Sequence, residues 1–222
     1  MTRALDAQRR EPLSGEIRSC VVFLHGYGAN AADLMGLADP LAEHMPDTLF
    51  IAPDAPEDCA GSPMGFQWFP IPWIAGSSEE DSRQGMLRAV DDLNAFLDGV
   101  MVDEDLLPEQ VIVLGFSQGT MMALHVLPRR EDPVAGLVAF SGRLLEPELL
   151  VDEVVCRPPV LLIHGDVDDV VPPQSLPQAA EALQEAGWKE VFGHVMKGTG
   201  HGIAPDGLSV ALAFMQQRLG LD

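Results

Sequence analysis

The sequence predicts an α/β fold with a mostly parallel sheet and helices on both faces of that sheet. Short apolar segments alternate along the chain with amphipathic helical segments, which favours parallel strands joined by helical crossovers. Several apolar segments are continuously hydrophobic rather than alternating, as in strands that are covered on both faces. Glycine-rich polar loops follow four of these segments, and such loops carry the functional groups of parallel sheets.

The predicted strands are rich in Val, Ile, Leu and Phe, and they span 19–26, 48–53, 111–116, 136–142, 160–165 and 190–196. The polar loops at their carboxyl ends read HGYGAN at 25–30, FSQG at 116–119, HGDVDD at 164–169 and KGTGHG at 197–202. Because parallel strands end at one edge of a sheet, these loops are expected to lie close together.

The clearest predicted helix spans 82–100, where apolar residues recur at steps of four and three on one face: Met86, Val90, Leu93, Leu97 and Val100. Ser77 and Glu80 predict a capping box before it. Further helices are expected at 120–127, at 175–186 before Gly187, and at 206–219 before Gly220.

A single domain over residues 1–222 is predicted, with residues 1–15 as an exposed tail. The chain has no repeat and no low-complexity tract, and hydrophobic residues make up 47% of it, enough for a sizeable core. Residues 142–159, between two predicted strands, have room for a short helix but not for a cap domain.

Charge and cysteine usage argue against several classes of partner. The net charge of −21 repels phosphate backbones and anionic lipids, so neither a nucleic-acid partner nor stable membrane association is expected. No apolar run approaches the roughly 18 residues of a membrane span, and the N-terminus lacks a signal-peptide core. Cys20, Cys59 and Cys156 are widely spaced and match no zinc pattern, which predicts reduced thiols in a cytoplasmic protein.

Ser117 is the first candidate catalytic residue. It follows the strand predicted at 111–116 and lies between Gly115 and Gly119 in the pattern G-x-S-x-G. A sharp strand-to-helix turn of this kind exposes the serine Oγ, and small flanking residues let the backbones approach closely. An ordinary glycine–serine turn is the alternative, but the apolar segments on both sides favour the nucleophile.

A serine nucleophile needs a base, and the base needs an acid that fixes its tautomer. His201 is the candidate base because it lies in the GTGHG loop before the last predicted helix, whereas His25 and His164 adjoin strand ends and are predicted to be structural. The HGDVDD loop supplies the acid. The order Ser, Asp, His along the chain is that of the α/β-hydrolases.

Taken together, the motifs resemble the bacterial phospholipase/carboxylesterase family of the α/β-hydrolases, which also includes the acyl-protein thioesterases. LHGYGAN, PDAP, GFQWF, GFSQG, HGDVDDVVP and GTGHG occur in the family's order over nearly the whole chain. The resemblance implies Ser117 as nucleophile, His201 as base and Asp168 as acid, while the neighbouring Asp169 remains an alternative to Asp168. It implies neither a metal nor an organic cofactor.

Acyl transfer also requires two N–H donors for the oxyanion. The hydrolase pattern assigns one to the backbone of Gln118, and the resemblance implies that Tyr27 in the HGYG loop supplies the other. A phosphate-binding loop is the alternative reading of HGYG, but it lacks the G-x-G-x-x-G spacing and a P-loop lysine.

The long connection at 54–81 shows no clear period, and loops of this length tend to be functional. Its candidate walls for an acyl pocket are Phe66, Trp68, Phe69 and Ile71, together with Trp73. The alternative is that these side chains only pack the loop onto the core.

The predicted function is a serine carboxylesterase that hydrolyses short- to medium-chain esters of small molecules through an acyl-enzyme. A lysophospholipase or an acyl-protein thioesterase would use the same groups. A dienelactone hydrolase is less favoured because that family has cysteine in place of Ser117. A non-catalytic binding protein of this fold is less favoured because all three reacting residues are present. The resemblance leaves a homodimer as an alternative to a monomer.

Overall fold

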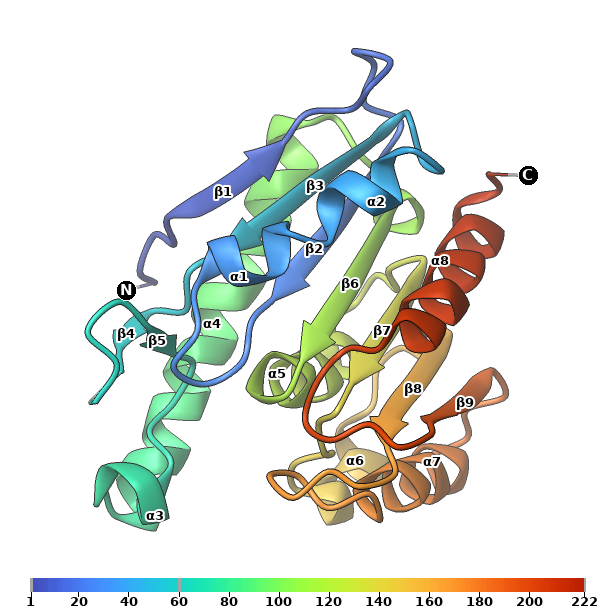
Figure 1. Cartoon of the computed structure of the whole chain (residues 1–222). Helices are drawn as coiled ribbons and strands as arrows, with labels where there is room; N and C mark the ends of the chain where they lie inside the picture. The colour runs from blue at the N-terminus through green and yellow to red at the C-terminus, as the bar shows by residue number, and fades with distance from the viewer. Residues whose placement is uncertain (1, 60, 222) are drawn as a thin grey trace.

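The computed structural model describes residues 2–59 and 61–221, without the side chains of residues 73 and 75. Its main sheet has seven strands in the order β1-β3-β2-β6-β7-β8-β9. They are β1 (Ala7–Arg10), β2 (Ser19–Leu24), β3 (Thr48–Pro53), β6 (Val111–Phe116), β7 (Gly136–Phe140), β8 (Val160–Gly165) and β9 (Val191–Met196). Neighbouring strands are parallel except for the antiparallel pair β1–β3, so the predicted mostly parallel sheet is confirmed (Figure 1).

Helices cover both faces of the sheet, as predicted (Figure 1). The helices on one face are α1 (Ala31–Met35), α2 (Ala38–Ala42) and α8 (Pro205–Leu219). Those on the other face are α4 (Glu79–Asp103), α5 (Gln118–Val126) and α7 (Ser175–Glu185). The remaining elements of the described chain are the two-stranded ribbon β4 (Glu57–Asp58) and β5 (Phe66–Gln67), the short helices α3 (Pro72–Ala75) and α6 (Pro147–Glu153), and the 3-10 helices η1 (Pro108–Gln110) and η2 (Leu127–Arg129).

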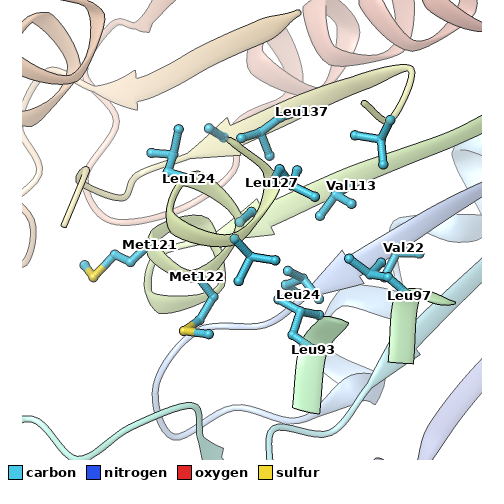
Figure 2. Packing of buried hydrophobic residues seen from close by; sticks show 14 of the residues in the cluster. Val22, Leu24, Leu93, Leu97, Val113, Met121, Met122, Leu124, Leu127 and Leu137 are labelled. Carbon is cyan, nitrogen blue, oxygen red and sulfur yellow. The ribbon is translucent and has the colours of Figure 1, made fainter. Parts of the chain in front are cut away.

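Side-chain alternation along the strands divides the core into two layers. Val22 and Leu24 of β2 face α4 and α5, whereas Val21 and Phe23 face the opposite layer with α1, α2 and α8. Figure 2 shows the first layer, in which the apolar side chains of α5 pack against the strands and against Leu93 and Leu97 of α4. Both layers hold the strand ends in fixed positions, and the candidate site is built on those ends.

The N-terminal segment is mostly exposed, as predicted, but it is not a free tail, because Ala7–Arg10 forms the edge strand β1 on β3. Its side chains are mostly exposed, which explains why no hydrophobic pattern revealed it. Arg3 fixes the segment further: its backbone N–H donates to Asp92 Oδ1 at 2.6 Å and its Nε donates to Oδ2 at 2.8 Å. Asp92 lies on α4 and is buried, so Arg3 neutralises a carboxylate inside the fold.

Helix α4 is longer than predicted, and its cap lies one residue later. Ser78, not Ser77, is the N-cap; it accepts from the N–H of Asp81, and the Asp81 carboxylate accepts from the N–H of Ser78. The capping box is therefore Ser78–Asp81 rather than Ser77–Glu80. The acidic first turn suits the positive end of the helix dipole in either register.

The segment between β7 and β8 contains α6, a helix of seven residues, in agreement with the predicted absence of room for a cap domain. None of the helices in the described residues combines the length and the apolar character that crossing a membrane requires.

Candidate active site

The turn between β6 and α5 holds Ser117 in a conformation that few non-glycine residues adopt. Its φ is 55° and its ψ is −114°, which costs about 1–3 kcal/mol of backbone strain. The N–H of Ser117 donates to the carbonyl of Phe140 at 2.9 Å and fixes the turn against β7. A Cβ on Gly115 would lie 2.6 Å from the backbone of Thr120, and a Cβ on Gly119 would collide with the carbonyl of Leu24. Both positions therefore require glycine.

Ser117, His201 and Asp168 form a hydrogen-bonded relay at the carboxyl ends of three strands. His201 Nδ1 lies 2.7 Å from Asp168 Oδ2, and His201 Nε2 lies 3.0 Å from Ser117 Oγ. A carboxylate can only accept, so Nδ1 carries the imidazole proton and Nε2 is free to accept from the Ser117 hydroxyl. This is the tautomer that a general base needs. The Phe116 ring, 4.9 Å from that of His201, packs against the imidazole.

The Asp168 side chain is fully buried and its carboxylate is well satisfied. Oδ1 accepts from the N–H groups of Val170 and Val171, each at 2.9 Å, while Oδ2 accepts from His201. Burial alone would raise the pKa of Asp168, but the hydrogen bonds from His201 and the two backbone N–H groups outweigh it and hold the pKa below its usual value. The alternative acid, Asp169, is exposed and points to no partner among the described residues.

His25 and His164 have the structural roles that their positions predict. His25 donates from Nδ1 to the carbonyl of Gly26 at 2.7 Å and accepts at Nε2 from the N–H of Ala55 at 2.9 Å. These partners fix a neutral ring, and burial lowers its pKa. His164 Nε2 lies 2.9 Å from the carbonyl of Val171 and therefore supports the loop that carries Asp168.

The loop after β2 lies directly against the nucleophile. A Cβ on Gly26 would lie 3.2 Å from Ser117 Cβ, so the next peptide, that of Tyr27, is adjacent to Ser117. Burial and the Cys59 thiol raise the pKa of the Tyr27 phenol to about 12. Gln118 is the first residue of α5, so its backbone N–H has no partner within the helix. The two residues expected to supply oxyanion donors thus lie next to Ser117, Tyr27 directly after Gly26 and Gln118 along the chain.

The Gln118 side chain has a role that the sequence did not reveal. It is buried, and its Oε1 accepts from the N–H of Trp68 at 2.9 Å while its Nε2 donates to the carbonyl of Phe69 at 2.8 Å. The residue after the nucleophile therefore fastens the long connection at 54–81 to the start of α5. The partners of this polar side chain lie about 50 positions away in the sequence, so no local or periodic pattern could reveal the contact.

Gln118→Ala is expected to lower the free energy of unfolding by about 2–4 kcal/mol, because it leaves two buried backbone groups without partners. The backbone N–H of residue 118 remains in this variant. We therefore expect kcat/KM to fall less for an acetate ester than for a butyrate ester, because the longer acyl chain would contact the loosened segment. Thermal unfolding and ester kinetics measure the two effects. Gln84→Ala, at an exposed site on α4, is the matched control. An unchanged melting temperature for Gln118→Ala would contradict this role.

The four residues expected to line an acyl pocket separate into two groups. Phe69 and Ile71 line a cavity of about 180 Å³ together with Met121 of α5 and residues 170–172 beyond β8. Trp68 is instead fully buried, and its indole N–H donates to the carbonyl of His25 at 3.0 Å. Phe66 lies in β5 and packs against the core. The Trp73 side chain lies outside the described residues.

A second cavity of about 540 Å³ adjoins the first and shares Phe69, Glu79, Ser82 and Arg143 with it. The second cavity is the more polar of the two, since its further walls include Glu80, Arg83 and Glu146. In the described part of the chain, no cluster of three or more His, Cys, Asp or Glu side chains could hold a metal ion.

A mostly parallel sheet with a serine turn after β6, an acid loop after β8 and a histidine loop after β9 defines the class of the α/β-hydrolases. The profile of the Phospholipase/Carboxylesterase family matches residues 11–219.

Individual relatives agree with this match. Acyl-protein thioesterase 1 of Saccharomyces cerevisiae is 29% identical over 214 residues, 91% of this chain and 93% of the relative. A probable carboxylesterase of Oryza sativa subsp. japonica is 30% identical over 86% of this chain and 74% of the relative. The crystal structure of esterase PE8 superposes with a TM-score of 0.90 at 41% identity, covering 98% of this chain and 100% of that one. The chain belongs to the phospholipase/carboxylesterase family, and its class of enzyme is that of the carboxylic ester hydrolases.

Proposed function

We propose that the chain is a serine carboxylesterase that hydrolyses short- to medium-chain esters of small molecules. The observation that carries the proposal is the relay from Ser117 through His201 to Asp168, in the tautomer that can remove the serine proton. His201 takes this proton while Ser117 Oγ attacks the ester carbonyl, and it then protonates the leaving alcohol. Water, activated by the same imidazole, releases the acid and regenerates Ser117. The N–H groups of Tyr27 and Gln118 stabilise the oxyanion of both steps.

A fluorophosphonate probe tests the nucleophile directly, because it reacts with an activated serine. Mass spectrometry should locate one adduct on Ser117, and the Ser117→Ala variant should remain unlabelled. Labelling of another serine would refute the assignment of Ser117 as nucleophile, and absence of labelling would favour a binding protein of this fold.

The cavities support short- to medium-chain acyl groups. The apolar cavity beside Met121 is small, and in the adjoining cavity a longer chain would meet charged walls at Glu80, Arg83 and Glu146. Each methylene buried in the apolar part should raise kcat/KM by roughly fourfold, and the gain should end where the charged walls begin. Kinetics on 4-nitrophenyl esters from acetate to palmitate check this, with a maximum expected near butyrate to octanoate. A maximum at palmitate would favour the alternative below.

Thioester hydrolysis on acylated proteins is the second candidate, because relatives over nearly the full length carry the name acyl-protein thioesterase. The same relay would attack a thioester carbonyl. Parallel assays on an octanoyl ester and an octanoyl thioester of the same leaving-group size separate the two candidates.

We also infer that residues 1–222 act as one catalytic domain in a reducing, cytoplasmic compartment. The family match and the continuous sheet support the single domain. The cysteines of the described chain are buried and form no disulfide, which suits a reducing environment.

A further inference from the structure

Arg143 differs from the other arginines of this acidic chain. Within the described residues, every other arginine makes an ion pair, a hydrogen bond or a ring contact, whereas Arg143 makes none. The chain has 34 acidic and 13 basic side chains, so a carboxylate partner is easy to find on its surface. An exposed guanidinium that has none is available to a ligand.

The backbone places Arg143 beside the nucleophile. The carbonyl of Phe140, at the end of β7, accepts from the N–H of Ser117, and a Cβ on Gly142 would lie 2.9 Å from the carbonyl of Ser117. Arg143 follows directly and lines the apolar cavity. The same cavity is lined by Met121, one turn beyond Ser117, and by Val171, whose N–H binds Asp168. Arg143 is therefore part of the wall that would receive the acyl chain.

The charges around this wall are distributed unevenly. Arg83, in the adjoining cavity, has Glu146 at 3.6 Å as a partner. Glu79 lines both cavities without an ion pair among the described residues, and it would repel an anionic chain or compete for Arg143. The net charge of −21 disfavours anionic substrates in general, so local recognition by Arg143 would have to overcome it.

We propose that Arg143 binds a carboxylate at the far end of the acyl chain, so that monoesters of short dicarboxylic acids are preferred substrates. The planar guanidinium can hold such a carboxylate through two parallel hydrogen bonds, while the apolar wall contacts the methylenes between it and the ester. The inference rests on the proposed esterase function and names its substrate class.

The test compares monomethyl glutarate, which is anionic at neutral pH, with dimethyl glutarate, which is neutral and nearly the same size. The measured quantity is the ratio of kcat/KM for the monoester to kcat/KM for the diester, followed in a pH-stat. Arg143→Gln is expected to lower this ratio by roughly 10- to 100-fold, and Arg143→Lys by less, because lysine keeps the charge but not the planar pair of donors. Glu79→Gln should raise the ratio.

Arg18→Gln is the matched control, since it removes one positive charge at the amino end of β2, whereas the candidate site lies at the carboxyl ends of the strands. It should leave the ratio unchanged. The inference is overturned if the ratio is equal in wild type and Arg143→Gln, or if Arg18→Gln lowers it equally. In either case, hydrolysis of the diester would still support the proposed esterase function. Absence of hydrolysis of both esters, together with absence of fluorophosphonate labelling, would instead overturn the proposed function itself.

Discussion

Ser117→Ala and His201→Ala are each expected to lower kcat for a short-chain ester by roughly 10⁵- to 10⁶-fold, and the double variant should be no worse than either one. The two residues act as one unit: without the imidazole the hydroxyl keeps its proton, and without the hydroxyl the imidazole has nothing to activate. Stopped assays with nitrophenyl butyrate measure the loss.

Folding should survive both substitutions, because each side chain lies in a turn or loop and its removal opens little of the core. Circular dichroism and thermal unfolding provide the control. If His201→Ala retained a rate near that of wild type, another histidine would be the base. His25 and His164 would then be the first to examine, although both already hold hydrogen bonds to backbone groups.

Asp168→Asn is expected to lower kcat by roughly 10⁴-fold, whereas Asp169→Asn should change it by less than about threefold. An asparagine amide can donate to His201 Nδ1, which would move the imidazole proton to Nε2 and leave no acceptor for the Ser117 hydroxyl. Asp169 is exposed and has no such contact within the described chain, so it serves as a matched control for charge and position. The reverse ranking would move the acid by one residue.

We expect the ionisation of Asp168 to make the free energy of unfolding depend on pH. Its pKa is lower in the folded protein than in the unfolded chain. Its ionised form therefore stabilises the fold above the unfolded value of about 4, and this contribution is lost as the pH falls through the folded pKa. The difference in unfolding free energy between wild type and Asp168→Asn should accordingly shrink when urea titrations are moved from pH 7 toward pH 3.

The strands and the chain order of the site could be predicted because both leave local signals. Apolar strands such as Val111–Phe116 end at glycine-rich loops, and a parallel sheet brings such ends to one edge. The edge strand β1 left no such signal, because its four residues are mostly exposed and depend on pairing with β3. Helix α1 was missed because five residues are too few for a helical period, although Asn30 and Asp33 form a readable capping box.

For the long connection at 54–81, amino-acid composition cannot predict which apolar side chains line a pocket. Apolar side chains in a loop can line a pocket or fill the core, and only their tertiary contacts decide between the two. Phe69 and Ile71 line a cavity, whereas Trp68 is buried beside His25. The Gln118 side chain was overlooked for the same reason, since its partners lie about 50 positions earlier in the chain.

The positive φ of Ser117 has an evolutionary consequence. Glycine adopts this backbone region without strain, so a glycine at position 117 would relieve part of the roughly 1–3 kcal/mol that serine stores there. A selection for heat resistance alone would thus reward the loss of the nucleophile. Laboratory evolution of this enzyme toward higher temperature should screen for turnover in every round, because a substitution that removes the nucleophile can itself raise stability.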